Sequence, residues 1–204
     1  MLRLYDYLPS GNGYKVRLLL TQLSIPFERI ELDILKGETR TLEFLTKNPN
    51  GRIPLLELES GQFLAQSNAI LFYFSEGTEF LPDDRFLRAQ ILQWLFFEQY
   101  SHEPNIATSR FWISILGKAE EYRHALEQKR QLGHAALTEM EKHLTSHTFF
   151  VDEHYTIADI GLYAYTHVAD EGGFDLINFP AIQAWLERVK AQPRHIKITD
   201  NAIA

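Results

Sequence analysis

Residues 48–67 have the sequence NPNGRIPLLELESGQFLAQS, which contains a turn, a predicted hairpin and the start of a predicted helix. Residues 48–51 are rich in turn formers, and Pro54 stands at the first position of a predicted strand, where its missing N–H group is tolerated. A cis peptide bond before Pro54 would turn the backbone of Ile53 outward and leave its N–H and C=O groups free. An extended, peptide-like ligand could pair with such an edge, as an added strand does.

Gln66 and Ser67 follow the hairpin and open a predicted helix. A serine at a helix N-terminus satisfies one backbone donor, and the amides beside it form a pocket for an anion. Backbone pairing next to an anion pocket would suit a small anionic peptide. The same pattern also fits an ordinary hairpin followed by a capped helix, so this stretch alone leaves both interpretations open.

The composition argues against several classes of function. The chain has 204 residues, 45% of them hydrophobic, and a formal charge of −7. The acidic balance argues against nucleic acid as the main partner, because phosphate binding needs a basic surface. With no cysteine, the chain has no disulfide, no thiolate metal site and no cysteine nucleophile. No apolar run approaches the roughly 20 residues of a membrane span, and no signal peptide precedes the first strand pattern, so we expect a cytoplasmic protein without a membrane partner.

Residues 1–76 are predicted to form an α/β domain. Residues 2–7 alternate as a strand does, residues 14–23 carry apolar side chains at helical spacing, and residues 27–32 alternate again. This β-loop-α-β unit of about 30 residues predicts two parallel strands. A short helix over residues 39–46, the hairpin, and a helix over residues 68–74 complete the order βαβ, α, ββα.

Residues 77–84 are predicted to be a linker, and residues 85–204 are predicted to be an all-helical domain. Only helical periodicity is visible from residue 85 to residue 192. We expect Pro104 to break or kink a long helix, and we expect residues 118–143 to form a charged amphipathic helix.

Two polar patterns in the second half have structural interpretations. Thr156 and Asp159 have the spacing of an N-terminal capping box and open an apolar helix. His143 and His147 are spaced i, i+4, but no catalytic zinc pattern accompanies them. We therefore interpret them as histidines that interact with the dipole of a helix end, and we predict no metal site.

An α/β half of this order followed by an all-helical half resembles the cytosolic glutathione S-transferases over essentially the whole chain. Residues 50–54, NGRIP, look like the family's G-[KR]-[IVL]-P turn, which ends in a cis-proline of a thioredoxin-like domain. Gln66-Ser67 is similar to the Glu/Gln-Ser pair at its third helix, and residues 156–159 resemble the capping box of its buried helix. Residues 10–17 are closest to bacterial members with serine or threonine and asparagine in this loop, theta- and nu-like in type.

The resemblance implies that glutathione, a γ-glutamyl-cysteinyl-glycine peptide, is bound as a co-substrate and that no cofactor is needed. Its thiolate is the nucleophile, and an unperturbed thiol has a pKa of about 8.5. Ser10 and Asn12, with nearby backbone N–H groups, are the candidate catalytic donors to the sulfur. Tyr5 and Tyr7 stay open as alternative donors, because related groups use a tyrosine near the end of the first strand.

The other glutathione contacts are carried over by position. Ile53, beside Pro54, would pair its backbone with the cysteinyl unit, and Gln66 and Ser67 would hold the γ-glutamyl end. The glycine carboxylate would lie near two basic residues, Lys36 and Arg40, for which the alternative is a role as solvated surface charges.

The second substrate would lie between the domains, against the kinked helix. The candidates there are aromatic or basic: Tyr100, Arg110 and Phe111. The alternative is that the aromatic residues belong to the core.

These features favour an enzyme that conjugates the glutathione thiolate to small, electrophilic, apolar substrates, as detoxifying transferases do. A glutathione-dependent peroxidase or disulfide-bond reductase is the first alternative, and a non-catalytic glutathione- or ligand-binding protein on the same fold is the second. The resemblance also implies a homodimer.

Overall fold

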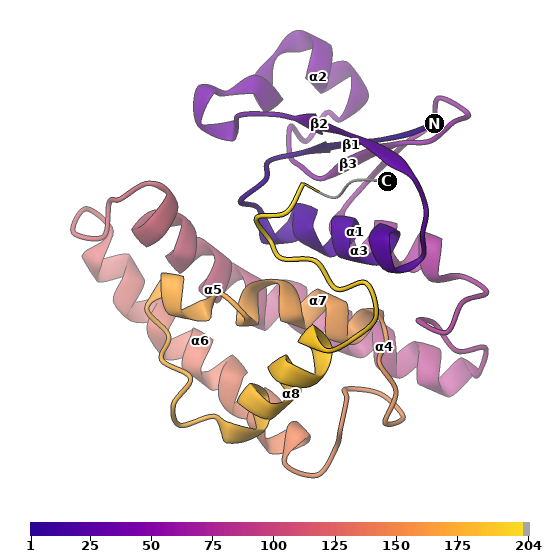
Figure 1. Ribbon diagram of the computed structural model, residues 1–204. Coiled ribbons are helices and arrows are strands. Elements are labelled where there is room, and N and C mark those ends of the chain that lie inside the picture. Colours follow the sequence, from indigo (N-terminus) through magenta and orange to yellow (C-terminus); the bar gives the residue numbers. More distant parts are fainter. Residues whose placement is uncertain (202–204) are drawn as a thin grey trace. The chain divides into compact units, whose positions relative to one another are not determined.

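Residues 1–201 are described by the computed structural model in Figure 1, and they separate into two compact units. The N-terminal unit comprises Met1–Glu76 together with the described residues from Pro193 onward. The helical unit comprises Gly77–Gln192. The predicted order of an α/β half followed by a helical half is confirmed.

A four-stranded mixed sheet with the order β2-β1-β3-β4 forms the centre of the N-terminal unit. β1 (Leu2–Asp6) and β2 (Phe27–Glu31) are parallel, and α1 (Gly11–Gln22) supplies the crossover that a parallel pair needs. β3 (Leu55–Glu57) runs antiparallel to β1 and to β4 (Phe63–Ala65), so the predicted hairpin is confirmed.

Helices cover both faces of this sheet (Figure 1). α1 and α3 (Ser67–Ser75) lie on one face, where Leu4, Leu56 and Ile70 are buried together. α2 (Leu42–Lys47) lies on the other face, where Phe44 packs with Tyr5 and Leu55. Successive strand residues point to opposite faces, so Leu4 and Tyr5 enter different cores. The short helix predicted over residues 39–46 is divided between the 3₁₀ turn η2 (Glu38–Arg40) and α2, and another 3₁₀ turn, η1 (Ile34–Lys36), precedes them.

The segment that begins at Pro193 packs against α1 of the N-terminal unit. The Tyr14 hydroxyl donates to Ile196 O at 2.7 Å, and Arg17 Nη1 donates to Ile198 O at 3.0 Å and to Asp200 O at 2.8 Å. The predicted domain boundaries counted residues 193–204 with the helical domain. In the structure, residues 193–201 belong instead to the N-terminal unit, because side chains of α1 bind their backbone carbonyls.

The helical unit begins before its first helix. Within the predicted linker 77–84, Phe80 and Leu81 are buried, and Ile157 N donates to Phe80 O at 3.2 Å. This part of the segment is therefore packed into the helical unit. The elements that follow are α4 (Arg85–Phe97), η3 (Glu98–His102), α5 (Glu103–Arg110), η4 (Phe111–Ile115), α6 (Arg123–Leu144), α7 (Ile157–Thr166), η5 (Ala169–Gly172) and α8 (Pro180–Lys190).

Two helix predictions in this unit can be compared with the structure. The predicted interruption next to Pro104 is present: the π-helical turn η3 separates α4 from α5, and Pro104 occupies the first turn of α5, where its missing N–H group is not required. α6 begins at Arg123, five residues later than predicted, because Gly117 adopts a φ of +65° and a turn follows it.

α7 is the buried helix of this unit, and all its residues are buried. The predicted capping box is confirmed: Thr156 Oγ1 accepts from Ala158 N, and Asp159 Oδ2 accepts from Thr156 N at 2.9 Å. The other carboxylate oxygen of Asp159 accepts from Phe150 N at 3.2 Å and from Trp185 Nε1 at 2.9 Å. Asp159 therefore joins the start of α7 to two other segments.

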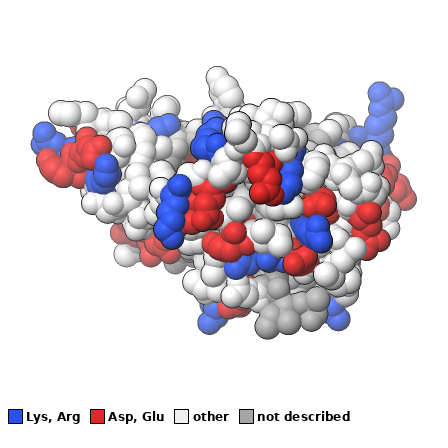
Figure 2. Space-filling view, turned by 90° about the horizontal axis from the view of Figure 1, so that it is seen from above, with Lys and Arg blue, Asp and Glu red and all other residues white. Residues whose placement is uncertain are grey.

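The face shown in Figure 2 carries acidic and basic side chains side by side, and neither sign forms a continuous patch on it. Among residues 1–201, no helix has the length and apolar character needed to cross a bilayer.

Candidate functional site

The Ser10 loop, residues 7–13, connects β1 to α1 and includes the first residues of that helix. Ser10 is the N-cap of this helix, and its Oγ accepts a hydrogen bond from Gly13 N at 3.3 Å. Glycine is required at position 13, because a Cβ there would lie 1.6 Å from Oδ1 of Asp6. A hydroxyl that accepts one bond still has its O–H to donate. Capping α1 and donating to a ligand sulfur are therefore compatible roles for Ser10.

Asn12 and Ser67 are brought together from two helices. The Ser67 hydroxyl donates to Asn12 Oδ1 at 3.2 Å across a separation of 55 residues in the sequence. Ser67 is the first residue of α3, and the N-cap residue is Gln66, with a φ of +74°. The predicted helix start is confirmed, but the predicted capping bond is wrong, since no side-chain cap bond forms at α3. The Ser67 side chain instead connects α3 to the Ser10 loop.

Lys15 completes this cluster, and sequence reasoning missed it. Its side chain is fully buried, with Nζ 2.9 Å from Asn12 Oδ1 and 3.4 Å from Ser67 Oγ. Asn68 Oδ1 lies 3.5 Å from the same nitrogen. A lone lysine in a helix usually indicates a solvated charge. The one available signal was its i, i+3 spacing from Asn12, which places both residues on one face of α1.

The predicted backbone edge lies at Ile53. The Ile53–Pro54 peptide bond is cis, and the sheet pairing of β3 begins only at Leu55. Ile53 is therefore not paired in the described sheet. The side chain of Asn48 donates to Arg52 O at 2.7 Å and holds the turn that precedes this edge.

The two basic candidates lie in different surroundings. Arg40 Nη1 donates to Asn50 O at 3.1 Å, so this exposed side chain lies on the turn before Ile53. Lys36 is exposed and pairs with Asp33 at 3.0 Å, and this partner raises the pKa of the lysine. The structure thus brings Arg40, but not Lys36, into contact with the turn.

The alternative donor Tyr5 is already engaged on the α2 face of the sheet. Its hydroxyl donates to Glu57 Oε2 at 2.7 Å, its ring packs edge-on against Phe44, and burial raises its pKa. Tyr7 is half-buried, and its carbonyl accepts from Ser10 N at 2.7 Å. The geometry favours Ser10 over Tyr5, because Tyr5 would have to give up an internal bond to reach a sulfur.

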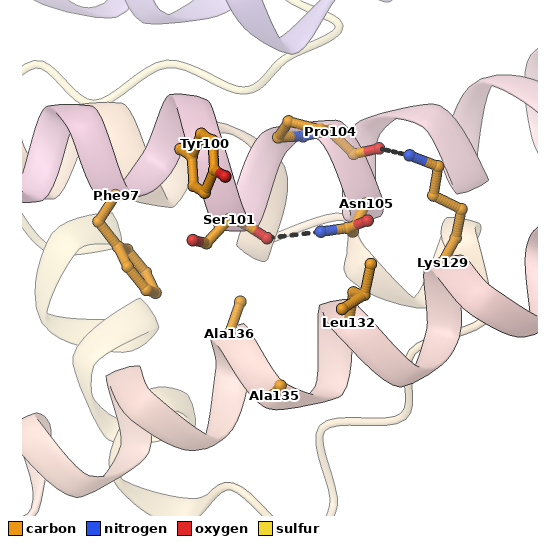
Figure 3. Close-up of a pocket in the computed structure, with 9 residues that line it drawn as sticks. All are labelled: Phe97, Tyr100, Ser101, Pro104, Asn105, Lys129, Leu132, Ala135 and Ala136. Carbon is orange, nitrogen blue, oxygen red and sulfur yellow. Dashed lines mark hydrogen bonds between the residues drawn. The ribbon is translucent and has the colours of Figure 1, made fainter.

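The three second-substrate candidates do not meet at one place within the helical unit. Tyr100 is 87% exposed and lines a pocket of about 510 Å³ between η3–α5 and α6. Figure 3 shows Phe97 and Tyr100 on one side of this pocket and Leu132 and Ala136 on the other.

The other two candidates have different environments. Arg110 is buried, and its Nε lies 2.8 Å from Glu171 Oε2. Phe111 is half-buried in the π-helical turn η4. The predicted grouping is therefore not seen, and the second-substrate role of Tyr100 stays a prediction.

The His143–His147 pair is a packing feature. Its rings stack 4.2 Å apart, Phe150 stacks on His143, and burial lowers the pKa of His143. Within the described range 1–201, no group of three or more His, Asp or Glu side chains could hold a metal ion.

Behind the Ser10 loop, Asp6 and Arg17 form a fully buried ion pair. Arg17 Nε lies 2.9 Å from Asp6 Oδ2, and Arg17 Nη2 donates to Leu8 O at 2.7 Å. Burial raises the pKa of the Asp6 carboxyl to about 6, an effect that outweighs the opposing influence of Arg17. Through the bond from Arg17 to Leu8 O, the pair fixes the backbone of the Ser10 loop. The pKa of the Asp6 carboxyl lies well above its ordinary value of 3.8.

This raised pKa predicts a pH dependence of stability. Between pH 4 and about 6 the folded protein holds more protons at Asp6 than the unfolded chain does. The stabilisation from this group is present below the ordinary pKa and is lost as pH rises through about 6. We expect Asp6→Asn to flatten the pH dependence of the free energy of unfolding in this window, by about 3 kcal/mol at most. Urea unfolding at pH 4.5, 5.5 and 7 gives the free energy of unfolding of both proteins. An equal change of this free energy with pH in wild type and Asp6→Asn would contradict the prediction.

Comparisons with known proteins agree over nearly the whole chain. Residues 1–76 match the family described as glutathione S-transferase, N-terminal domain, and residues 90–193 match glutathione S-transferase, C-terminal domain. A curated relative, the disulfide-bond oxidoreductase YfcG of Escherichia coli K12, is 30% identical over 203 residues, covering 95% of this chain and 92% of that protein.

Solved structures are similar as well. The crystal structure of a glutathione S-transferase from Pseudomonas fluorescens Pf-5 is 53% identical, with a TM-score of 0.96, and the match covers 98% of this chain and 99% of that one. Ure2p in complex with glutathione is 26% identical, with a TM-score of 0.85, and the match covers 97% of this chain and 93% of that one.

Proposed function

Because the chain belongs to the glutathione S-transferase family, we propose that it binds glutathione in its N-terminal unit and directs the thiolate at small, apolar electrophiles. The resemblance inferred from the sequence is confirmed at the level of the family, as is the fold, a thioredoxin-like domain followed by a helical domain. Glutathione is the co-substrate in this proposal, and no further cofactor takes part.

Two observations carry the proposal: the contact between Asn12 and Ser67, and the position of Ile53 outside the sheet pairing. In the proposed complex, Ile53 pairs with the cysteinyl unit and the start of α3 holds the γ-glutamyl carboxylate. Ser67 and Gln66 belong to this second contact. A peptide held at both points places its sulfur over the N-terminal end of α1.

Activation of the thiol needs only hydrogen-bond donors. Hydrogen bonds to a charged acceptor contribute about 1.5–3 kcal/mol, and one pKa unit corresponds to about 1.4 kcal/mol. Ser10 and Asn12 would therefore lower the thiol pKa by about one to two units from its usual value near 8.5. The dipole of α1 acts in the same direction with about 0.3–1 kcal/mol. The thiolate then attacks the electrophile, and the leaving group departs with its electron pair.

A panel of second substrates tests this proposal. The purified protein is assayed with glutathione and aryl halides, epoxides, peroxides or disulfides, each against the uncatalysed rate. We expect turnover with aryl halides or epoxides that exceeds turnover with peroxides and disulfides. Glutathione binding without turnover of any member would contradict the proposal and favour the non-catalytic ligand-binding alternative.

A disulfide-bond reductase is the second candidate, and the similarity to YfcG favours it. This chain has no cysteine, so glutathione would supply the sulfur. The bound thiolate would attack a disulfide, form a mixed disulfide and release one thiolate, which takes up a proton. A second glutathione would then resolve the mixed disulfide, giving oxidised glutathione and the second thiol. Higher turnover with disulfides than with aryl halides would select this reaction.

We further propose that the protein works as a homodimer in the cytoplasm, where glutathione is a major thiol buffer. Leu92 and Phe96 lie four residues apart on α4, on one side of the helix, and are 36% and 70% exposed. Leu132, 47% exposed, lines the pocket of Figure 3. Large apolar side chains with this much exposure are typical of a surface that another chain covers.

A charge at position 96 is expected to separate the dimer. Phe96→Asp should shift the protein from dimer to monomer at micromolar concentration, because burying an unpaired carboxylate in an interface is unfavourable. Sedimentation velocity measures this shift, and Ile177→Asp, at a similarly exposed apolar residue, is the matched control. A monomeric wild type, or an unchanged dimer in Phe96→Asp, would contradict this proposal.

A further inference from the structure

Lys15 is a buried cation whose neighbours are hydrogen-bond acceptors. Its side chain is 0% exposed, although lysine is rarely buried without partners. Oxygen atoms of Asn12, Ser67 and Asn68 lie 2.9, 3.4 and 3.5 Å from its Nζ. An ammonium group has three donors and no acceptor. Each of these contacts must therefore be one in which Lys15 donates.

Because Lys15 can only donate, the direction of the hydrogen bond between Ser67 and Asn12 is determined as well. Ser67 Oγ accepts from Lys15, so its own hydroxyl hydrogen is available to Asn12 Oδ1, 3.2 Å away. Asn12 Oδ1 thus accepts from both Lys15 and Ser67. If the Asn12 amide were turned over, its NH₂ group would face the ammonium, donor against donor. The amide oxygen consequently stays on the Lys15 side, and the Nδ2 donors lie on the other branch of the side chain.

We propose that Lys15 is a positioning residue for the thiol site: it holds the Asn12 amide with its N–H donors presented to the sulfur and joins that loop to Ser67 at the start of α3. This inference rests on the proposed function. Lys15 does not touch the ligand, because its side chain is fully buried; it acts through Asn12 and Ser67. A neutral donor could orient the amide, but only a cation also adds an attraction for the developing thiolate, which water screens weakly in a buried site.

The test measures the thiol pKa of bound glutathione from thiolate absorbance in wild type and Lys15→Met. Methionine keeps an unbranched stem and removes the charge and the donors. We expect the thiol pKa to rise by about one unit, which lowers kcat/KM about tenfold at pH 6.5 and much less at pH 9. A merely structural role would lower the folded fraction without moving the acid limb of the pH profile. Lys142→Met, at an exposed lysine of α6 that pairs with Glu139, is the control for loss of one positive charge.

A second variant keeps the inference testable if Lys15→Met does not fold. Asn12→Asp keeps an oxygen for Lys15 and replaces the Nδ2 donors with a second acceptor. We expect this variant to fold, to bind glutathione and to raise the thiol pKa by at least about one unit. A wild-type thiol pKa in Asn12→Asp would overturn the inference, because the sulfur would then not depend on the orientation of that amide.

The outcomes separate this inference from the proposed function. If the wild type does not bind glutathione, the proposed function fails. If the wild type binds glutathione with a lowered thiol pKa and a folded Lys15→Met leaves that value unchanged, the proposed function stands and the role of Lys15 is refuted.

Discussion

Arg17→Met is expected to lower the free energy of unfolding by about 3–5 kcal/mol. Arg17 and Asp6 are both fully buried, and the substitution leaves the Asp6 carboxylate without its cationic partner. It also removes the donors that bind Leu8 O in the Ser10 loop and Ile198 O in the C-terminal segment. Urea unfolding at pH 7 measures the loss.

A control and a rescue variant make this prediction specific. Arg3→Met removes a half-exposed arginine that pairs with Glu28, and it should change stability by less than about 1 kcal/mol. Adding Asp6→Asn to Arg17→Met removes the uncompensated charge and should recover part of the loss. Equal effects of Arg17→Met and Arg3→Met, or no recovery in the double variant, would contradict the assigned role of the ion pair.

Asp159→Ala is expected to destabilise the helical unit by at least about 3 kcal/mol. The carboxylate accepts from Thr156 N, Phe150 N and Trp185 Nε1, and its removal leaves these buried donors unsatisfied. Unfolding followed by tryptophan fluorescence reports on this loss, because Trp185 is one of the partners.

Asp159→Asn tests whether the shape of the side chain or its capacity to accept hydrogen bonds matters more. Asparagine keeps one oxygen and the volume of the side chain, so we expect it to lower the free energy of unfolding by roughly half as much as Asp159→Ala, or less. Asp159→Glu, which keeps the charge but lengthens the side chain, should not restore the bonds inside a fully buried site. A loss below about 1 kcal/mol in Asp159→Ala would show that the capping box is dispensable.

Much of the fold was predictable because local patterns and tertiary structure agree. Alternation in residues 2–7 and the helical spacing after Pro9 predicted the parallel βαβ unit, and Thr156 with Asp159 predicted the start of α7. These signals depend on periods of 2 and 3.6 residues and on caps, which are visible in a single sequence.

The remaining features depend on contacts between distant residues, which a single sequence does not reveal. Lys15 looks like a surface charge until the start of α3 is placed beside it. Tyr5 looks like a possible thiol donor until Glu57 is found on its hydroxyl. The packing of the segment after Pro193 on α1 depends on backbone carbonyls, which carry no side-chain pattern.

The same limit explains the second-substrate candidates. Tyr100 and Arg110 were grouped because both lie on the long helix that was predicted to kink at Pro104. The π-helical turn η3 and the ion pair with Glu171 place them in different surroundings. Residue type and spacing predicted the segment but not the direction of each side chain.

The central claim is that the Ser10 loop stabilises the thiolate of bound glutathione. The most direct measurement is the thiolate absorbance of bound glutathione as a function of pH in wild type, Ser10→Ala and Asn12→Ala, with Ser60→Ala in the exposed hairpin turn as the control. We predict a wild-type thiol pKa about one to two units below 8.5, an increase in both loop variants, and no change in the control. A thiol pKa that neither loop variant raises would contradict the mechanism.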